Sequence, residues 1–349
     1  MKKIIILLGI SLGSLFAQSG TDVTGTSSGG DGFSKAGSAG GQFLKIGPGA
    51  RANAMGGAAT AVVNDLSAIH WNPAGVAAID DIQVYVSYTS WFADYQQNYA
   101  AIAAPINDDF TVSVFFLSFG VNDIPVTTIN RPDGTGSNYS VNDVMFGAGF
   151  HGNLTEQFSF GINAKYVQNA FETVSAGGFA FDIGTMYDTN IEGIKLGFSI
   201  HNLSAERTYS GTALQVQTNQ IDNVKSPDNG GTQSDLAVVV PAWPFSLPLI
   251  FRAGLSKDII DSEKHYLLAS ADFVTMSDAP EQFALGAEYT WNDILSLRGG
   301  YYYGNDQLGL SGGAGIKYLS GDFDGTLEYS ANPTNNFGFI HRLNVIMDF

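Results

Sequence analysis

Cysteine is absent from this chain of 349 residues, and charged residues are few. The absence of cysteine excludes a disulfide framework and a lipid anchor carried by cysteine. Only 14% of the residues are charged, where a typical soluble protein has about 25%. Basic residues are the scarcest, with 16 Lys and Arg against 33 Asp and Glu and a formal net charge of −17. This balance argues against nucleic acid as a partner and against membrane-surface binding through a basic patch.

Long apolar runs are also missing beyond the N-terminus. Lys2 and Lys3 precede an apolar stretch over residues 4–16, and Ala17 is a plausible cleavage point, so we expect residues 1–17 to be a cleaved secretory signal peptide. No later run of 18 apolar residues occurs, which argues against a membrane-spanning helix. In lipid only helices and closed barrels satisfy every backbone polar group. An exported chain with so few charges therefore favours an outer-membrane barrel over a soluble β-sandwich, propeller or solenoid.

The chain is rich in glycine, with 42 residues, and in aromatic residues, which make up 12%. From residue 82 onward, apolar and polar residues alternate with the period of two that is typical of a β-strand. We expect fourteen strands, at residues 82–92, 96–105, 110–121, 140–151, 157–171, 175–187, 194–203, 247–257, 264–273, 282–291, 294–303, 309–319, 322–330 and 338–349. Most have about 9 to 13 residues, close to what a tilted strand needs to cross a bilayer. The predicted fold class is therefore all-β, a transmembrane antiparallel β-barrel of about 14 strands over residues 81–349.

The lengths of the connections agree with a barrel. Alternate connections of an up-and-down barrel emerge on the same side, and one side has short turns. The even-numbered connections are short, whereas the two long ones, 122–139 and 204–246, are the third and the seventh. Both long loops are therefore expected on the extracellular side. The last strand ends in Phe349, and a terminal Phe on an alternating strand resembles the signal that the barrel assembly machinery reads.

Two segments precede the strands. Residues 18–42 are rich in Gly and Ser and are typical of a flexible linker. Residues 43–80 form an Ala- and Gly-rich, nearly uncharged block with short helical stretches. Such a block does not pack as an ordinary domain by itself, and its size and polarity suit the inside of a barrel. We therefore expect it to fold into the lumen as a short helical hatch.

Arg51 is the one arginine of this block, and inside the lumen it needs carboxylate partners. The candidates at inward-facing strand positions are Asp182, Glu288, Asp324 and Glu328. Such a pair has two interpretations, a gating latch and a structural ion pair. Asn72 and Pro73 likewise either hold the end of the hatch against the wall or simply cap a short helix.

The end of the second long loop is aromatic. Trp243, Phe245 and Leu247 are candidates to cover the barrel mouth and to contact an apolar ligand or a cargo protein. The alternative is that they begin the eighth strand at the membrane interface. The five histidines are scattered and show no metal-ligand spacing. We expect no catalytic residue, no metal site and no cofactor, and hence no enzymatic activity.

Three motifs within residues 43–77 carry a resemblance to a known family. They are Phe-Leu-x-Ile-Gly-x-Gly-Ala-Arg at Phe43–Arg51, Met-Gly-Gly-Ala at Met55–Ala58, and Asp-x-Ser-Ala-x-x-Trp-Asn-Pro-Ala-Gly at Asp65–Gly75. This ordered set resembles the opening of the PorV/PorQ family of outer-membrane proteins, which is itself similar to the FadL-type fatty-acid transporters. The resemblance implies a fourteen-stranded barrel with an N-terminal hatch inside it. The hatch or gating residues that it implies are Arg51, Met55, Gly56, Gly57, Asn72, Pro73, Ala74 and Gly75.

The resemblance also implies a function. The barrel would take part in type IX protein secretion by binding or shuttling secreted cargo at the cell surface, in the outer membrane of a Gram-negative bacterium. The implied partners are outer-membrane lipid, the barrel assembly machinery, secreted proteins with C-terminal sorting domains and other components of the secretion system. Two alternatives stay open, a FadL-like channel for the uptake of hydrophobic small molecules and a structural or adhesive barrel.

Overall fold

The computed structural model describes residues 37–217, 237–320 and 323–349. The expected signal peptide, most of the expected linker and the middle of the loop over residues 204–246 lie outside the described residues. Within the described ranges, no helix is long and apolar enough to cross a membrane.

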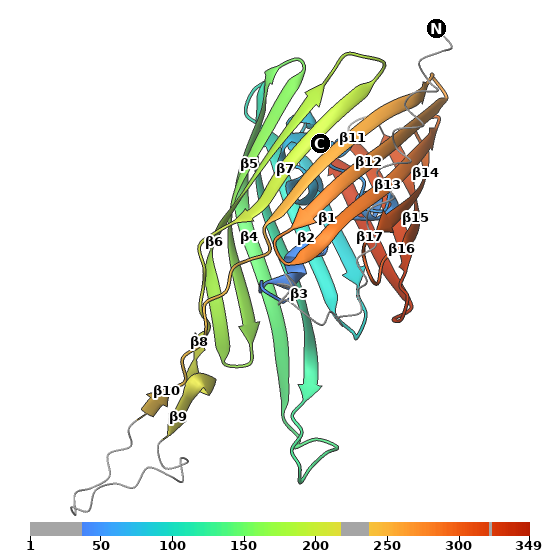
Figure 1. Ribbon diagram of the computed structural model, residues 1–349. Coiled ribbons are helices and arrows are strands. Elements are labelled where there is room, and N and C mark those ends of the chain that lie inside the picture. Colours follow the sequence, from blue (N-terminus) through green and yellow to red (C-terminus); the bar gives the residue numbers. More distant parts are fainter. Residues whose placement is uncertain (1–36, 218–236, 321–322) are drawn as a thin grey trace, which may run out of the picture. The chain divides into compact units, whose positions relative to one another are not determined.

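Fourteen antiparallel strands close into a barrel (Figure 1). Their bounds are β1 (Gln83–Ser90), β2 (Gln96–Pro105), β3 (Phe110–Pro125), β4 (Asn138–Thr155), β5 (Phe158–Phe171), β6 (Val174–Asp188), β7 (Ile194–Leu203), β11 (Ile250–Asp261), β12 (His265–Met276), β13 (Ala279–Trp291), β14 (Leu295–Tyr303), β15 (Leu310–Ser320), β16 (Phe323–Pro333) and β17 (Phe339–Asp348). Each strand pairs with the next, β7 pairs with β11 across a long connection, and β1 pairs with β17 to close the ring. This confirms the expected fold class and all fourteen expected strands, with shifts of a few residues at their ends.

Two ends of the barrel can be told apart by their connections. The β3–β4 and β7–β11 connections emerge at one end, which we call the long-loop end. The β7–β11 connection contains β8 (Ser210–Gly211), η3 (Thr212–Leu214), β9 (Gln215–Gln217) and β10 (Ala237–Val239). The opposite end, which we call the short-turn end, has brief connections at residues 106–109, 156–157, 189–193, 262–264 and 292–294.

Strands β3 and β4 run further than their sequence pattern indicates. Pro125 pairs with Asn138, beyond a register shift between Val121 and Ile124. Part of the expected loop 122–139 is therefore strand, and the hairpin stands out at the long-loop end (Figure 1). The prediction ended the strand at residue 121 because the irregularity interrupts the period of two on which it relied.

Side chains alternate between the two faces of the wall. On β13, Phe283 and Leu285 point outward and are exposed, whereas Gln282 and Glu288 point inward and are buried. Lipid favours an apolar outer surface, and the polar side chains turn to the lumen. The inward polar groups then need partners inside the barrel.

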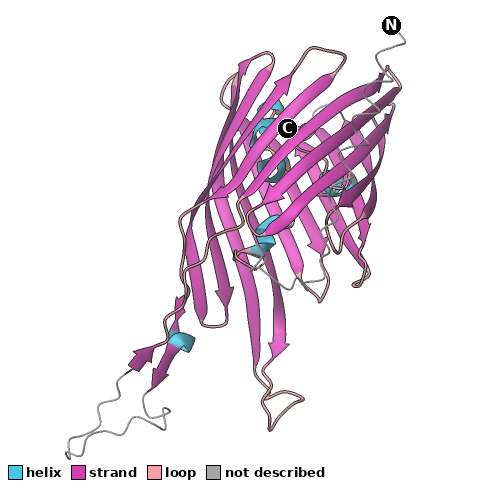
Figure 2. Ribbon diagram, in the orientation of Figure 1, coloured by secondary structure: helices cyan, strands magenta, loops and turns pink. Residues whose placement is uncertain are grey.

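Those partners come from residues 42–79, which we call the plug and which lie within the ring of strands (Figure 2). The plug is built from short helices, namely η1 (Gln42–Lys45), α2 (Ala50–Ala54), α3 (Ala68–Trp71) and η2 (Pro73–Ala78). Most of its residues are buried. Its many Ala and Gly residues suit this place because small side chains allow several short helices to fit inside one barrel.

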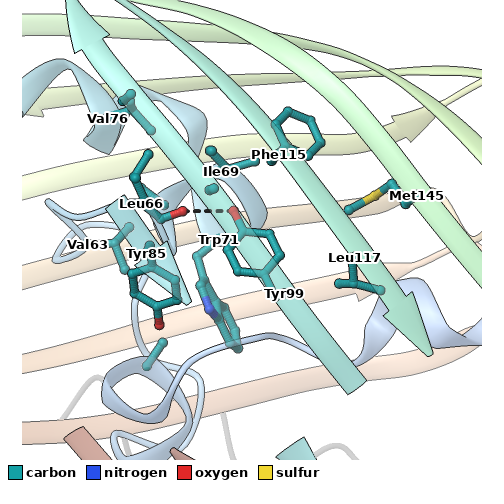
Figure 3. Packing of buried hydrophobic residues seen from close by; sticks show 14 of the residues in the cluster. Val63, Leu66, Ile69, Trp71, Val76, Tyr85, Tyr99, Phe115, Leu117 and Met145 are labelled. Carbon is teal, nitrogen blue, oxygen red and sulfur yellow. Dashed lines mark hydrogen bonds between the residues drawn. The ribbon is translucent and has the colours of Figure 1, made fainter. Parts of the chain in front are cut away.

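The hydrophobic core lies between the plug and the wall (Figure 3). Leu66 and Ile69 of the plug belong to one buried cluster with Tyr85, Tyr99 and Phe115 of strands β1 to β3. The Tyr99 hydroxyl donates a 3.0 Å hydrogen bond to the Leu66 carbonyl. Burial of each large apolar side chain stabilises the fold by about 1.5–3 kcal/mol. The plug is therefore held as part of the core.

Candidate functional site in the plugged lumen

The wall supplies hydrogen-bond partners to the backbone of the plug. Helices of four to six residues leave most of their terminal N–H and C=O groups without a helical partner, and Ala and Gly side chains offer none. The wall side chains that bond plug backbone groups include Ser87, Gln97, Asn163, Ser199, Ser256, Asp272, Ser311, Asn332 and Asn344. These residues come from nine strands around the ring. The plug is thus anchored on all sides, through its backbone.

Two wall glycines mark where the plug backbone comes closest. A Cβ atom on Gly300 of β14 would overlap the backbone of Met55, and one on Gly161 of β5 would overlap the backbone of Pro73. Only glycine leaves the space for these approaches. The wall is therefore shaped for this plug in this position.

Arg51 binds one of its four expected partners directly. Its Nε and Nη2 atoms each donate a 2.9 Å hydrogen bond to Glu288 of β13. Glu288 also pairs with Arg298, which contacts Glu328 at 2.8 Å. A weaker partner is Asp65 of the plug, 3.7 Å from the guanidinium.

The two other candidate carboxylates lie elsewhere. Asp182 pairs with Lys165 at 2.8 Å, and Asp324 lies 3.7 Å from Lys317. Burial disfavours the charge on Arg51, but attraction to Glu288 outweighs it and raises the pKa of Arg51 well above its ordinary value. The pair therefore stays ionised and joins helix α2 to the wall.

Asn72 does both things that were expected of it. Its Oδ1 accepts a 3.2 Å bond from the Ala74 N–H and so caps η2. Its Nδ2 donates to the carbonyl of Thr60 at 2.7 Å and to that of Thr185 on β6 at 3.0 Å. The carbonyl of Pro73 is 2.8 Å from Nδ1 of His151 on β4. This end of the plug is both capped and tied to the wall.

The remaining motif residues are buried or set the turns of the plug. Met55 and Ala74 are enclosed, with at most 1% of their surface exposed. Gly56 and Gly57 have φ angles of +67° and +81°, a region that glycine adopts at little cost. A Cβ atom on Gly75 would overlap the carbonyl of Val63. These contacts account for the motif as a packing pattern, and a gating role for it stays a prediction.

The three aromatic-loop candidates do not share one site. Trp243 is 89% exposed, whereas Leu247 is 2% exposed and belongs to the hydrophobic core. Phe245 is half-buried. Its ring stacks on Tyr209, and its backbone forms 2.9 Å hydrogen bonds with the backbone of Arg207. All three precede the first residue of β11, Ile250.

Phe349 follows the last residue of β17. Its side chain is 60% exposed, and its N–H bonds the carbonyl of Ile82 at 3.0 Å. In the described part of the chain, no group of three or more His, Asp or Glu residues is arranged to hold a metal ion.

Two cavities lie on opposite sides of the plug. The long-loop cavity, of about 350 Å³, is bordered by Asn53 and Trp71 of the plug and by Arg252 and Arg342 of the wall. The short-turn cavity, of about 290 Å³, is bordered by Arg51 and other charged residues, namely Asp65, Glu288, Asp293, Arg298, Lys317, Glu328 and Asp348. The two cavities share no lining residue.

Sequence reasoning missed several lumen residues. The alternation along the last strand puts Arg342 on the polar face, but nothing in the sequence relates it to Arg252, which is 90 positions away. His151 is one of five scattered histidines, and its neighbours in the sequence do not indicate a partner. The alternation of side chains along each strand could have indicated both residues, because a polar residue at an inward-facing position must meet the plug.

The closed strand ring and the enclosed plug define a barrel of the outer-membrane type. Residues 34–214 match the family described as type IX secretion system protein PorV. The match spans more than half of the chain, so the chain belongs to this family, and the resemblance found in the motifs is confirmed. Membership associates the chain with type IX secretion and with the outer membrane. A comparison with curated proteins gives no match.

Solved structures share the fold. A FadL homologue from Pseudomonas aeruginosa has a TM-score of 0.54 at 13% identity, over 86% of this chain and 98% of that one. The CymD monoaromatic hydrocarbon channel has 0.56 at 12% identity, over 87% and 98%. The P. putida toluene transporter TodX has 0.55 at 14% identity, over 87% and 99%. At such low identity these similarities establish the FadL-like fold alone.

Proposed function

We propose that this barrel binds secreted proteins through their C-terminal sorting domains at the long-loop end and passes them on within a type IX secretion apparatus. The observation that carries the proposal is the family match over residues 34–214. The long-loop end is the extracellular face in this proposal. The partners are the secreted proteins and other components of the secretion system.

The anchoring of the plug supports docking at the surface more than passage through the lumen. Each wall-to-plug hydrogen bond contributes about 0.5–1.5 kcal/mol, and an enclosed polar group left without a partner costs about 1–3 kcal/mol. Moving the plug as a unit would break bonds to Asp272, Asn332 and Asn344 on three separate strands together. A stationary plug suits a protein that receives cargo on one face.

The route to the membrane completes the proposal. Residues 1–17 direct export and are then removed, and Phe349 is read by the barrel assembly machinery before the barrel inserts into outer-membrane lipid. The intact mass of the protein from outer membranes tests the first step, since a chain that still carries residues 1–17 would contradict it. Deletion of Phe349 tests the second, and unchanged membrane levels would contradict that step.

Co-purification tests the docking function. The tagged full-length chain is isolated from cells that have a type IX apparatus, with and without a secreted protein that bears a C-terminal sorting domain. We expect that protein to be retained, and a version without its sorting domain to be lost. Equal recovery of both versions, or of neither, would sink the proposal.

One observation favours the channel alternative. An apolar cavity of about 510 Å³ lies at the long-loop end, under Tyr209, Leu214 and Ala242 and against β4 to β6. Apolar cavities of this size hold small ligands in other proteins. Toluene uptake by liposomes that contain the barrel tests this reading. Uptake no faster than in empty liposomes would leave docking or a structural or adhesive role.

A further inference from the structure

The long-loop cavity holds two arginines without carboxylate partners. Arg252 and Arg342 are 4% and 1% exposed, and both border this cavity. Within the described ranges, no Asp or Glu forms an ion pair with either of them. Nη1 of Arg252 and Nε of Arg342 are enclosed and have no hydrogen-bond partner. Each guanidinium therefore keeps unused donors.

Aromatic rings and one amide partly compensate these charges. Arg252 lies over the ring of Trp71 at 5.2 Å, and Arg342 over Trp91 at 5.6 Å. Arg342 also donates a 2.5 Å hydrogen bond to Asn332. Such cation–π contacts contribute about 0.5–2 kcal/mol each. A buried cation ordinarily needs an anion or a full set of hydrogen bonds, and these contacts supply neither.

The opposite side of the plug shows what complete compensation looks like. Arg51 and Arg298 border the short-turn cavity, and both pair with Glu288, while Arg298 also pairs with Glu328. The chain has only six arginines. Two of them form ion pairs on one side of the plug. On the other side Arg252 and Arg342 form none, although Asp272 and Asp182 attract Arg252 from beyond ion-pair distance. The unbalanced pair faces the end that the proposed function assigns to cargo.

The other residues of the long-loop cavity indicate what the missing anion is attached to. Lys45 adds a third cation, but it is paired with Asp278 at 2.8 Å, and the one carboxylate among the lining residues is Asp306. Five amide side chains also border the cavity, at Asn53, Gln282, Asn305, Gln307 and Asn332, beside apolar residues such as Met276, Pro280 and Leu308. Amides pair with peptide groups, whereas an acyl chain would leave them without partners.

We propose that the long-loop cavity binds a carboxylate carried on a peptide, with Arg252 and Arg342 as its cationic contacts. A guanidinium presents parallel N–H donors that match the two oxygens of a carboxylate. Trp71 and Trp91 also border the cavity and contact one arginine each, and the amides receive the peptide groups next to the carboxylate. The proposal rests on the proposed function only for the source of the peptide, which would be an exported protein.

Calorimetric titration of the full-length barrel in detergent tests this site. The probe is the peptide acetyl-Ser-Gly-Ser-Ala with a free C-terminal carboxylate, alongside the same peptide with a C-terminal amide and alongside octanoate. We expect saturable binding of the free acid and at least tenfold weaker binding of the amide and of octanoate. Equal binding of acid and amide, tighter binding of octanoate, or no binding of the acid would each overturn the proposal.

Variants locate the site. The double variant Arg252→Gln, Arg342→Gln should weaken binding of the free acid at least tenfold. It should not lower the temperature at which the barrel loses its compact gel mobility, because it removes two enclosed charges. Arg207→Gln is the matched control, since Arg207 is 6% exposed, forms no ion pair with a described carboxylate and does not border this cavity. It should bind like the unaltered chain, and unchanged binding in the double variant would overturn the proposal.

The two proposals fail separately. Retention of sorting-domain cargo by a barrel that binds no free-acid peptide would contradict the carboxylate site alone. Peptide binding by a barrel that retains no cargo would contradict the docking function alone. The comparison of acid with amide uses the unaltered chain, so the test stands even where a variant does not assemble.

Discussion

Arg51 and Glu288 join the plug to the wall through two parallel hydrogen bonds of 2.9 Å each. Arg51 lies on helix α2, and Glu288 points inward from β13, 237 residues later. The carboxylate of Glu288 also binds Arg298 of β14, which pairs with Glu328 of β16. Arg51, Glu288, Arg298 and Glu328 thus form a chain of ion pairs that links helix α2 to strands β13, β14 and β16.

Removal of either partner should destabilise the barrel by different amounts. Arg51→Met leaves Glu288 paired with Arg298, so we expect the free energy of unfolding to fall by about 1–3 kcal/mol. Glu288→Gln leaves Arg51 and Arg298 facing each other with fewer anions, and we expect a loss of about 3–5 kcal/mol. Urea unfolding of the barrel in lipid vesicles, with refolding as a check, measures both.

An exposed ion pair provides the control for these variants. Lys257 and Glu192 are 2.8 Å apart, with side chains 39% and 77% exposed, so Lys257→Met should change stability by less than about 1 kcal/mol. Conductance in planar bilayers then separates the two interpretations of the Arg51 pair. Normal stability of Arg51→Met together with raised conductance would point to a latch and contradict a structural pair.

A single methyl-bearing side chain at the wall should displace the plug. A Cβ atom on Gly300 would overlap the backbone of Met55, whereas one on the adjacent Gly299 has nothing nearer than 4.0 Å. We expect Gly300→Val to lower the heat stability of the folded barrel and to raise its conductance, while Gly299→Val leaves both unchanged. Similar behaviour of the two variants would contradict the close fit between plug and wall.

The strands could be predicted because lipid and lumen impose opposite demands on neighbouring residues. Along β13 this places Phe283 and Leu285 on one face and Gln282 and Glu288 on the other. This alternation can be recognised in the strand's own sequence, without knowing which strands pair with it. The pattern fails where geometry departs from a regular ladder, as after Val121 on β3. There, the sequence alone indicates a loop.

The interior of the barrel could be predicted only in part. Arg51 carries a charge, so its need for a lumen carboxylate could be stated, and Glu288 was among four candidates. Many plug contacts involve backbone groups, such as the N–H of Ala50 bonded to Asn344 at 2.7 Å. Almost every residue carries the same backbone groups, so the sequence does not show which of them will meet a wall side chain. Arg252 and Arg342 form a common cavity only through the closure of the ring, which brings β11 and β17 to the same lumen.

The stability of the barrel should depend on pH through His70 of helix α3. Burial, with a further contribution from Arg252, lowers the pKa of His70 well below its usual range. The unfolded chain has an ordinary histidine pKa of about 6.5. Below that pH the unfolded state takes up a proton that the folded state refuses, so acidification favours unfolding by up to about 1.4 kcal/mol per pH unit.

Comparison with a His70→Gln variant isolates this contribution. Both chains share the neighbouring groups His201, Lys165 and Asp182, so their effects cancel in the difference. Between pH 7.5 and 5 the unaltered chain should lose more stability than the variant, and above pH 7 the difference between them should be constant. Parallel curves over the whole range would show that His70 titrates alike in both states.

The aromatic loop offers a test that separates cargo contact from packing. Leu247 is 2% exposed, belongs to the hydrophobic core and packs against Gly41. Leu247→Ala should therefore lower the free energy of unfolding by about 2–5 kcal/mol. Trp243 is 89% exposed at the long-loop end, so Trp243→Ala should leave stability within about 0.5 kcal/mol but reduce retention of sorting-domain cargo. Trp291→Ala is the control, because this tryptophan is 48% exposed beside a short turn at the other end. Equal cargo retention by both tryptophan variants would remove Trp243 from the docking surface and leave the loop with a packing role through Leu247.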